Sequence, residues 1–322
     1  MPLVINLSYG TVWGSHKGDS LMERFINNAA EIGRTSIVVG CGNEGVGRSH
    51  AEVILRPGEI SLVELEVGEY DFDFSLHFFY PGNESFEITL LSPLGEEIHF
   101  PAQEGVYERI LETIRLDVTV SFPKPYTTYQ EVFVRVTPAG DFLPGGIWYI
   151  RIRAVDVLTG EMQIYISSAL ARTGNTGFVI PTADMTLTIP STAERVISVG
   201  AYSAYTNSYA AFSGRGMKGI GIQSFGLLKP DLVAPGVNIR IILPGGGFST
   251  AEGTSFATPF VSGSVALLME WGIVRGNDAY LYGEKVKAVL RRGARTLAGF
   301  DVLPNEREGW GALCLQNSLG SD

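Results

Sequence analysis

Residues 253–259 read Gly-Thr-Ser-Phe-Ala-Thr-Pro, and the interpretation of the whole chain depends on them. The glycine predicts a turn that delivers Ser255 to the N-terminus of a helix rich in small residues, which continues to Met269. A serine hydroxyl is a weak nucleophile alone, but the free N–H groups and positive dipole of a helix N-terminus stabilise a developing oxyanion. Pro259 is expected in the first turn, where its missing N–H would have no intrahelical acceptor. A buried helix with an ordinary serine near its N-cap fits the same residues.

This segment resembles the nucleophile motif Gly-Thr-Ser-x-Ala-x-Pro of the subtilisin-like serine proteases (subtilases), and it matches at every fixed position. Residues 42–45, Gly-Asn-Glu-Gly, resemble the subtilase oxyanion-hole segment. Residues 6–10, Asn-Leu-Ser-Tyr-Gly, resemble the strand that pairs with the backbone of the bound substrate.

The resemblance implies a serine endopeptidase that hydrolyses peptide or protein substrates through an acyl-enzyme on Ser255. It implies that Asn43 donates a side-chain N–H to the oxyanion. An extended substrate would then add as a strand along the cleft, which would be lined by Ser8, Tyr9, Gly10, Gly40, Cys41 and Gly42. Without the resemblance, an asparagine between glycines is more typical of a loop residue in the left-handed region.

Composition excludes some classes of protein. The chain has 322 residues, 45% of them hydrophobic and 18% charged, which predicts a globular protein with a sizeable core. A net charge of −10 leaves no excess of Lys and Arg to neutralise phosphates, so we expect no nucleic-acid partner. No apolar run reaches membrane-spanning length, so we expect no transmembrane helix and no membrane partner. The first residues lack the features of a signal peptide, and the localisation stays open.

The candidate metal ligands are few. Cys41 and Cys314 are the only cysteines, and their spacing predicts free, buried thiols rather than a zinc site or a disulfide. His77 and His99 fall in predicted strands, without a second ligand at metal-site spacing. Calcium is common in the family, but no carboxylate-rich loop here supports it, so we assign no metal and no cofactor.

Hydrophobic patterning divides the chain into three segments. Residues 1–51 and 174–322 read as α/β, whereas residues 52–173 alternate apolar and polar residues between Pro/Gly turns. We therefore predict a subtilisin-like, three-layer α/β fold with a parallel sheet. An all-β, jelly-roll-like sandwich is inserted between the oxyanion asparagine and the nucleophile. The inserted sandwich resembles that of the Csp germination proteases of spore-forming clostridia, some of which are pseudoproteases.

The first α/β segment predicts a strand, a helix and a parallel strand. The strands are expected at Leu3–Leu7 and Thr35–Val39. Between them, Asp19 is expected to cap a helix over about residues 20–32. The apolar face of that helix is predicted to contain Leu21, Phe25, Ala29 and Ile32. After the insertion, a strand is expected at residues 195–201 and helices at residues 254–269 and 283–292.

A serine protease also needs an imidazole base and a carboxylate that orients it. In subtilases both precede the oxyanion asparagine, yet the 42 residues before Asn43 contain neither Asp-Ser/Thr-Gly nor His-Gly-Thr-His. His16 and His50 lack the family context. We expect an N-terminal fragment carrying Asp and His, from a longer or split gene, to cover the outer edge of Leu3–Leu7.

Other readings stay open. The absence of the Asp and His motifs is also consistent with a wrongly assigned start of the sequence. They are consistent, too, with a pseudoprotease that binds or regulates on a subtilase scaffold, for example in spore germination. A third reading is a β-sandwich module that binds glycan or peptide, carried by an accessory scaffold.

Overall fold

The computed structural model describes residues 1–168, 172, 175–217, 228–299 and 302–319, and it divides the chain into two compact units. We call them the α/β unit (Met1–Thr11, His16–Val46 and Asp184–Asp322) and the β unit (Val12–Ser15 and Gly47–Ala183). The chain therefore passes briefly through the β unit at Val12–Ser15, leaves the α/β unit again after Val46 and re-enters it at Asp184.

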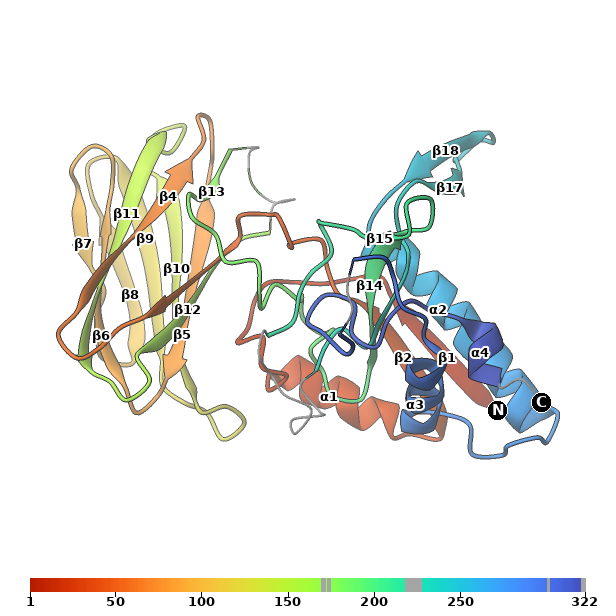
Figure 1. The fold of residues 1–322 in the computed structure, drawn as a ribbon. Helices are drawn as coiled ribbons and strands as arrows, with labels where there is room; N and C mark the ends of the chain where they lie inside the picture. Colours follow the sequence, from red (N-terminus) through yellow and green to blue (C-terminus); the bar gives the residue numbers. More distant parts are fainter. Residues whose placement is uncertain (169–171, 173–174, 218–227, 300–301, 320–322) are drawn as a thin grey trace. The chain divides into compact units, whose positions relative to one another are not determined.

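The α/β unit is built on a mainly parallel sheet (Figure 1). Its strand order is β1-β2-β14-β15, with β16 also paired to β14. β1, β2, β14 and β16 are parallel, and β15 is antiparallel. The bounds are β1 Pro2–Leu7, β2 Arg34–Gly40, β14 Ile197–Ser203, β15 Ser208–Tyr209 and β16 Leu232–Pro235. The parallel pairing of the first two predicted strands is confirmed.

Helices cover both faces of this sheet. Helix α2 (Thr254–Met269) packs on one face in a core with Val38 and Val199, and α1 (Leu21–Ala30) packs on the other with Ile37 and Val39. Neighbouring strand residues point to opposite faces, so the two cores are separated by the sheet and the unit has the three layers that the sequence predicts. The remaining elements are the π-helix η3 (Glu270–Val274), α3 (Glu284–Gly293), α4 (Leu315–Leu319) and the hairpin β17 (Ile239–Ile242)–β18 (Phe248–Ala251).

The cap of α1 differs from the prediction. Ser20, not Asp19, is the N-cap, and its hydroxyl accepts a 3.3 Å hydrogen bond from the Glu23 N–H. The Glu23 carboxylate in turn accepts a 3.0 Å bond from the Ser20 N–H. This reciprocal pair satisfies two helix-end donors at once, which a lone aspartate cannot do.

Three of the four residues predicted for the apolar face of the first helix are exposed. Leu21, Phe25 and Ile32 are 62%, 73% and 71% exposed, while Ile26 is buried against the sheet. Of the four predicted residues only Ala29 packs against the core, and Ile32 lies beyond the end of the helix, so the periodicity did not identify the face that packs on the sheet.

One helix reaches membrane-spanning length, contrary to the expectation from apolar runs. Residues 254–274, which form α2 and η3, are long and apolar enough by length and composition, and 44% of the apolar window is buried. Ala257, Val261, Val265 and Leu268 are buried in the core beneath the sheet, the pattern of a core helix.

The β unit contains two antiparallel sheets (Figure 1). One has the order β3-β12-β5-β10-β9-β8 and the other β13-β4-β11-β6-β7. The bounds are β3 His50–Ile54, β4 Ile60–Val67, β5 Phe74–Pro81, β6 Ser85–Leu91, β7 Glu97–His99, β8 Gly105–Ile110, β9 Ile114–Ser121, β10 Tyr129–Pro138, β11 Gly146–Asp156, β12 Glu161–Ile166 and β13 Gly177–Phe178. Residues of both sheets share one core, in which Phe74 and Trp148 meet edge to face at 5.6 Å, so the sheets form a sandwich.

Candidate active site

Ser255 is the second residue of α2 and is half-buried. The preceding N-cap, Gly253, has a φ of +139°, which favours glycine. A β-carbon on Gly253 would also lie 3.2 Å from Nδ2 of Asn43. The turn therefore requires glycine for its backbone conformation and for the close approach of Asn43.

Pro259 is the sixth residue of α2, so the expectation that it occupies the first turn was wrong. In the second turn its missing N–H leaves the carbonyl of Ser255, four residues earlier, without a helical donor. The Ser8 hydroxyl supplies the missing donor, at 2.9 Å from the Ser255 carbonyl oxygen. The nucleophile turn is thus attached to the end of β1.

Asn43 is held in one orientation by Thr254, the residue before the nucleophile. Its Oδ1 accepts bonds from the Thr254 N–H (3.0 Å) and hydroxyl (3.2 Å). The Thr254 hydroxyl itself accepts from the Gly42 N–H at 3.2 Å. With its oxygen engaged, Asn43 presents Nδ2 as a donor, which is the group that an oxyanion hole requires.

The other predicted cleft residues lie at the carboxyl ends of β1 and β2. Ser8, Tyr9 and Gly10 follow β1 and are exposed. Gly40 ends β2, where a β-carbon would lie 2.9 Å from the Thr258 hydroxyl on α2. Parallel strands present their carboxyl ends at one edge of the sheet, the usual place for ligands in α/β folds.

Cys41 contributes only backbone to this edge. Its thiol is fully buried, 3.4 Å from the Ser213 hydroxyl, and burial raises the pKa of the thiol to about 11. Its N–H bonds to the Val199 carbonyl, and its own carbonyl accepts from the Thr188 N–H. Both cysteines are free as predicted, but Cys314 is only half-buried.

None of the four histidines pairs with the nucleophile. Each contacts another polar group: His16 lies 2.6 Å from the Leu187 carbonyl, His50 2.6 Å from Gln163, His77 3.1 Å from Glu131 and His99 3.0 Å from Thr89. Within the described ranges, no group hydrogen-bonds to the Ser255 hydroxyl. In the same ranges, no cluster of three His, Cys, Asp or Glu side chains could hold a metal ion.

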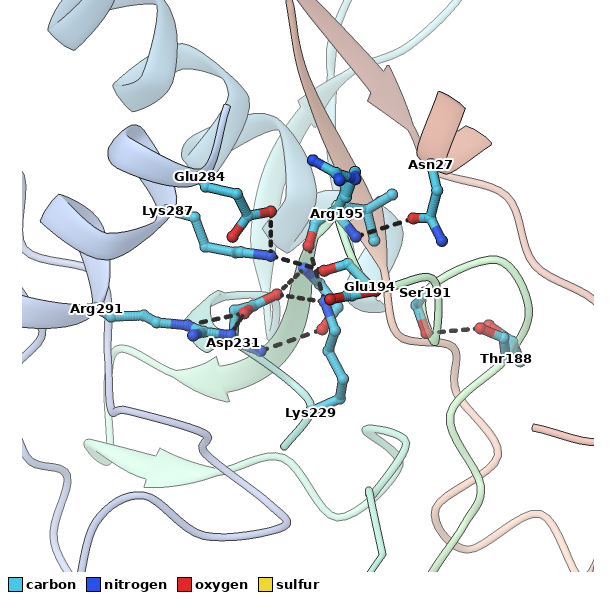
Figure 2. A network of polar contacts seen from close by, with 12 residues as sticks. Asn27, Thr188, Ser191, Glu194, Arg195, Lys229, Asp231, Glu284, Lys287 and Arg291 are labelled. Atoms are coloured by element: carbon cyan, nitrogen blue, oxygen red, sulfur yellow. Dashed lines mark hydrogen bonds and ion pairs between the residues drawn. The ribbon is translucent and has the colours of Figure 1, made fainter. Parts of the chain in front are cut away.

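A buried ion cluster lies at the start of β16, and sequence reasoning missed it (Figure 2). Asp231 is fully buried and accepts bonds from Lys229 Nζ (2.9 Å), the Ser198 N–H (2.6 Å) and the Arg291 guanidinium. The cluster joins β14, the start of β16 and α3. The available signal was Lys-Pro-Asp at residues 229–231, two charges beside an apolar strand.

The charged groups in this cluster shift one another's pKa values. Burial alone would raise the pKa of Asp231, but Lys229, Lys287 and Arg291 hold it below its ordinary value. Burial lowers the pKa of Lys229 to about 8, against the attraction of Asp231. The cluster lies at the amino-terminal ends of β14 and β16, and each of its charges has a structural partner, so we assign it a structural role.

Comparison with known proteins gives consistent results. The model of the subtilase family matches residues 152–311. The solved structure of the CspB protease of Clostridium perfringens is similar to 99% of this chain, with 36% identity and a TM-score of 0.89. This chain covers 65% of that CspB chain, slightly less than two thirds.

Other relatives match shorter stretches. Minor extracellular protease Vpr of Bacillus subtilis (strain 168) is 30% identical over 125 residues, 35% of this chain and 14% of Vpr. Pyrolysin of Pyrococcus furiosus is 43% identical over 101 residues, 30% of this chain and 7% of pyrolysin. The chain thus spans only a small part of these relatives.

Proposed function

Since the chain belongs to the subtilase family, we propose that it supplies the nucleophile, oxyanion hole and substrate cleft of a subtilisin-type serine endopeptidase. The observation that carries the proposal is the position of Asn43. Its Oδ1 is anchored on Thr254, so that Nδ2 is the free donor beside the nucleophile turn.

The chemistry follows from this arrangement. Ser255 Oγ attacks the scissile carbonyl, and an imidazole from outside this chain takes the hydroxyl proton. The carbonyl oxygen becomes an oxyanion, which accepts hydrogen bonds from Asn43 Nδ2 and the Ser255 N–H. The Ser255 N–H is one of the first helical amides, which have no intrahelical acceptor. Collapse to the acyl-enzyme protonates and releases the amine, and water then hydrolyses the ester.

We further propose that an N-terminal subtilase segment carrying Asp and His completes the site. Within the described residues β1 pairs only with β2, so the parallel sheet ends in an open edge that includes exposed Leu3. Helix α2 packs beside β1, with Ser262 Oγ 2.8 Å from Asn6 Oδ1. The outer side of α2 and η3 carries an exposed apolar stripe, which consists of Phe260, Leu267, Trp271 and Val274.

Parallel sheets in α/β folds are normally covered on both faces and rarely end in a long apolar edge. The open edge of β1, the stripe on α2 and η3, and the exposed residues of α1 are therefore surfaces that a further segment of the subtilase fold could cover. The part of the CspB chain that this chain does not cover is a source of such a segment.

The test is labelling of Ser255 by a fluorophosphonate probe. The chain would be measured alone and together with an N-terminal segment, taken from sequence upstream of residue 1 or from CspB. We expect strong labelling only in the complemented protein, and none in Ser255→Ala. A complemented protein that assembles but stays unlabelled would exclude the proposed endopeptidase function.

The second candidate is a pseudoprotease that binds or regulates on this scaffold. It is favoured by one observation, that no described histidine contacts Ser255. The Csp resemblance makes spore germination the setting that we propose for either role. Assembly with an Asp- and His-bearing segment, without labelling but with peptide binding, would favour the pseudoprotease.

A further inference from the structure

The β unit contains a cavity of about 300 Å³ that the proposed protease function does not use. Both sheets of the sandwich contribute to it, and the loops that follow β7 and β9 complete its lining. The strand residues are Tyr80 of β5, Gln130 and Val132 of β10, and Phe86 and Ile88 of β6. Cavities at the mouths of β-structures are a common position for small-ligand sites.

Two turns that touch each other fix one side of this cavity. A β-carbon on Gly82, in the turn between β5 and β6, would lie 2.0 Å from Cγ of Pro123, in the loop after β9. The Gly82 N–H also donates a 2.9 Å hydrogen bond to the carbonyl of Thr128 in the same loop. The cavity is therefore formed before a ligand enters, so that binding does not have to order these turns.

Glu84 is the one charged residue in the lining of the cavity as the structure describes it, and its carboxylate is already engaged. It accepts hydrogen bonds from the Leu158 N–H (3.2 Å), from the Thr159 N–H (2.7 Å) and hydroxyl (2.8 Å), and from the Gly160 N–H (3.1 Å). The cavity thus offers no free charge, and a charged ligand would be buried unpaired.

Two buried polar side chains, Tyr80 and Gln130, also line the cavity. They are 5% and 6% exposed and hydrogen-bond each other. Burial raises the pKa of Tyr80 to about 12, so the hydroxyl keeps its proton. When the Gln130 amide donates to the Tyr80 oxygen, the Tyr80 O–H is left as a donor and Gln130 Oε1 as an acceptor. Within the described residues neither side chain has another hydrogen-bond partner.

The remaining lining is largely aromatic. The Tyr80 and Phe86 rings meet edge to face at 5.1 Å, and Phe100 and Phe122 belong to the two loops. Such rings favour contact with another aromatic ring. A sugar would bury several hydroxyls, each of which needs a partner. A phenol needs only one donor and one acceptor, the number that Tyr80 and Gln130 leave free.

We propose that this cavity binds a phenol group, with its ring among the aromatic side chains and its hydroxyl against Tyr80 and Gln130. A tyrosine side chain of a peptide and a free phenol present the same chemistry to it. The proposal goes beyond the endopeptidase function and does not depend on it, since every residue that it uses lies in the β unit.

The test is a ligand-observed NMR titration of the chain with p-cresol, which is the tyrosine side chain without its backbone. We expect a Kd of about 1 mM, a typical value for so small a ligand. Toluene, which lacks the hydroxyl, should bind about 3- to 10-fold more weakly. Equal affinity for toluene, or no binding of p-cresol, overturns the proposal.

N-acetyltyrosine amide distinguishes the two sources of the phenol. Binding at least as tight as that of p-cresol supports a tyrosine presented on a peptide. Binding of p-cresol with none of the amide supports a free phenol, because the cavity then excludes the peptide backbone.

Two variants locate the site. Ala102 is exposed and lines the cavity, so Ala102→Trp fills the space without disturbing the core and should weaken p-cresol binding at least about 10-fold. Ala139→Trp, at an exposed alanine just beyond the other end of β10, is the matched control and should bind like the wild type. Unchanged binding in Ala102→Trp, or equal weakening in both variants, overturns the assignment to this cavity.

Gln130→Met keeps a similar volume and removes the amide. It should abolish the preference for p-cresol over toluene while toluene still binds, which also shows that the variant is folded. A preference that persists in Gln130→Met overturns the role of the amide in recognising the phenol hydroxyl.

Discussion

The hydroxyl of Ser8 donates a 2.9 Å hydrogen bond to the backbone carbonyl oxygen of Ser255, 247 positions away in the sequence. This carbonyl is the one that Pro259 deprives of its helical donor. A single proline within α2 thus makes the nucleophile turn dependent on the first strand of the chain.

A double-mutant cycle tests this dependence. Ser8→Ala is expected to lower the free energy of unfolding by about 1 kcal/mol, because the Ser255 carbonyl loses its donor. In the background of Pro259→Ala, the new backbone N–H supplies that donor, so the same change should cost much less. Urea denaturation measures the cost of Ser8→Ala in both backgrounds. An equal cost would show that the Ser8 hydroxyl does not replace the donor that Pro259 removes.

Asn43→Leu removes the oxyanion donor while keeping a similar side-chain volume. In the complemented protease we expect kcat to fall by about 10²–10³-fold with little change in KM, since the bond is made to the transition state rather than to the substrate. Steady-state hydrolysis of a peptide ester provides the measurement, with Ser255→Ala as the baseline. A rise in KM alone would mean that Asn43 binds substrate and does not stabilise the oxyanion.

Leu267→Glu places a charge in the exposed stripe on α2. The isolated chain should keep its stability, because that side chain is exposed in it. Association with the N-terminal segment should weaken at least about 10-fold, since the charge would be buried unpaired. Titration calorimetry gives the affinity, and Leu158→Glu, at an exposed leucine of the β unit, is the matched control. Equal weakening by both changes would argue against the stripe as the interface.

Asp231→Asn leaves the buried Lys229 and the half-buried Arg291 without their anion. We expect a loss of about 3–5 kcal/mol in the free energy of unfolding, as is typical for one removed partner of a buried ion pair. Glu270→Gln, which breaks the exposed pair with Arg275, should cost less than about 1 kcal/mol. Similar losses for both variants in chemical denaturation would contradict the structural role of the cluster.

Cys41 gives a pH-dependent prediction. Burial raises the pKa of its thiol from 9.0 to about 11, so the folded state holds this proton more tightly than the unfolded state. The resulting stabilisation is complete below pH 9 and is lost as pH rises through 11. Cys41→Ala should therefore lose stability less steeply than the wild type between pH 9 and 11. Identical slopes for the two proteins would show that the thiol is not held in this way.

Thiol alkylation checks the same burial. At pH 8 iodoacetamide should leave Cys41 unmodified until denaturant is added, because the Cys41 side chain is buried and its thiol stays protonated. The half-buried Cys314 provides the internal comparison.

Local patterns in the sequence were sufficient for the nucleophile segment at residues 253–259, the parallel strands β1 and β2 and the alternating strands of the β unit. Each depends on residues close together in the chain, where periodicity and turn chemistry act directly. The family followed from the same short segments.

Only the tertiary structure decided the relations between distant segments. It attached Asn43 to Thr254 and Ser8 to Ser255, and it left Leu21 and Phe25 of α1 exposed while Ile26 packs on the sheet. A sequence pattern gives the face of an element on which a side chain lies. Which distant group meets that face depends on packing, and packing is fixed only when the whole sheet is assembled.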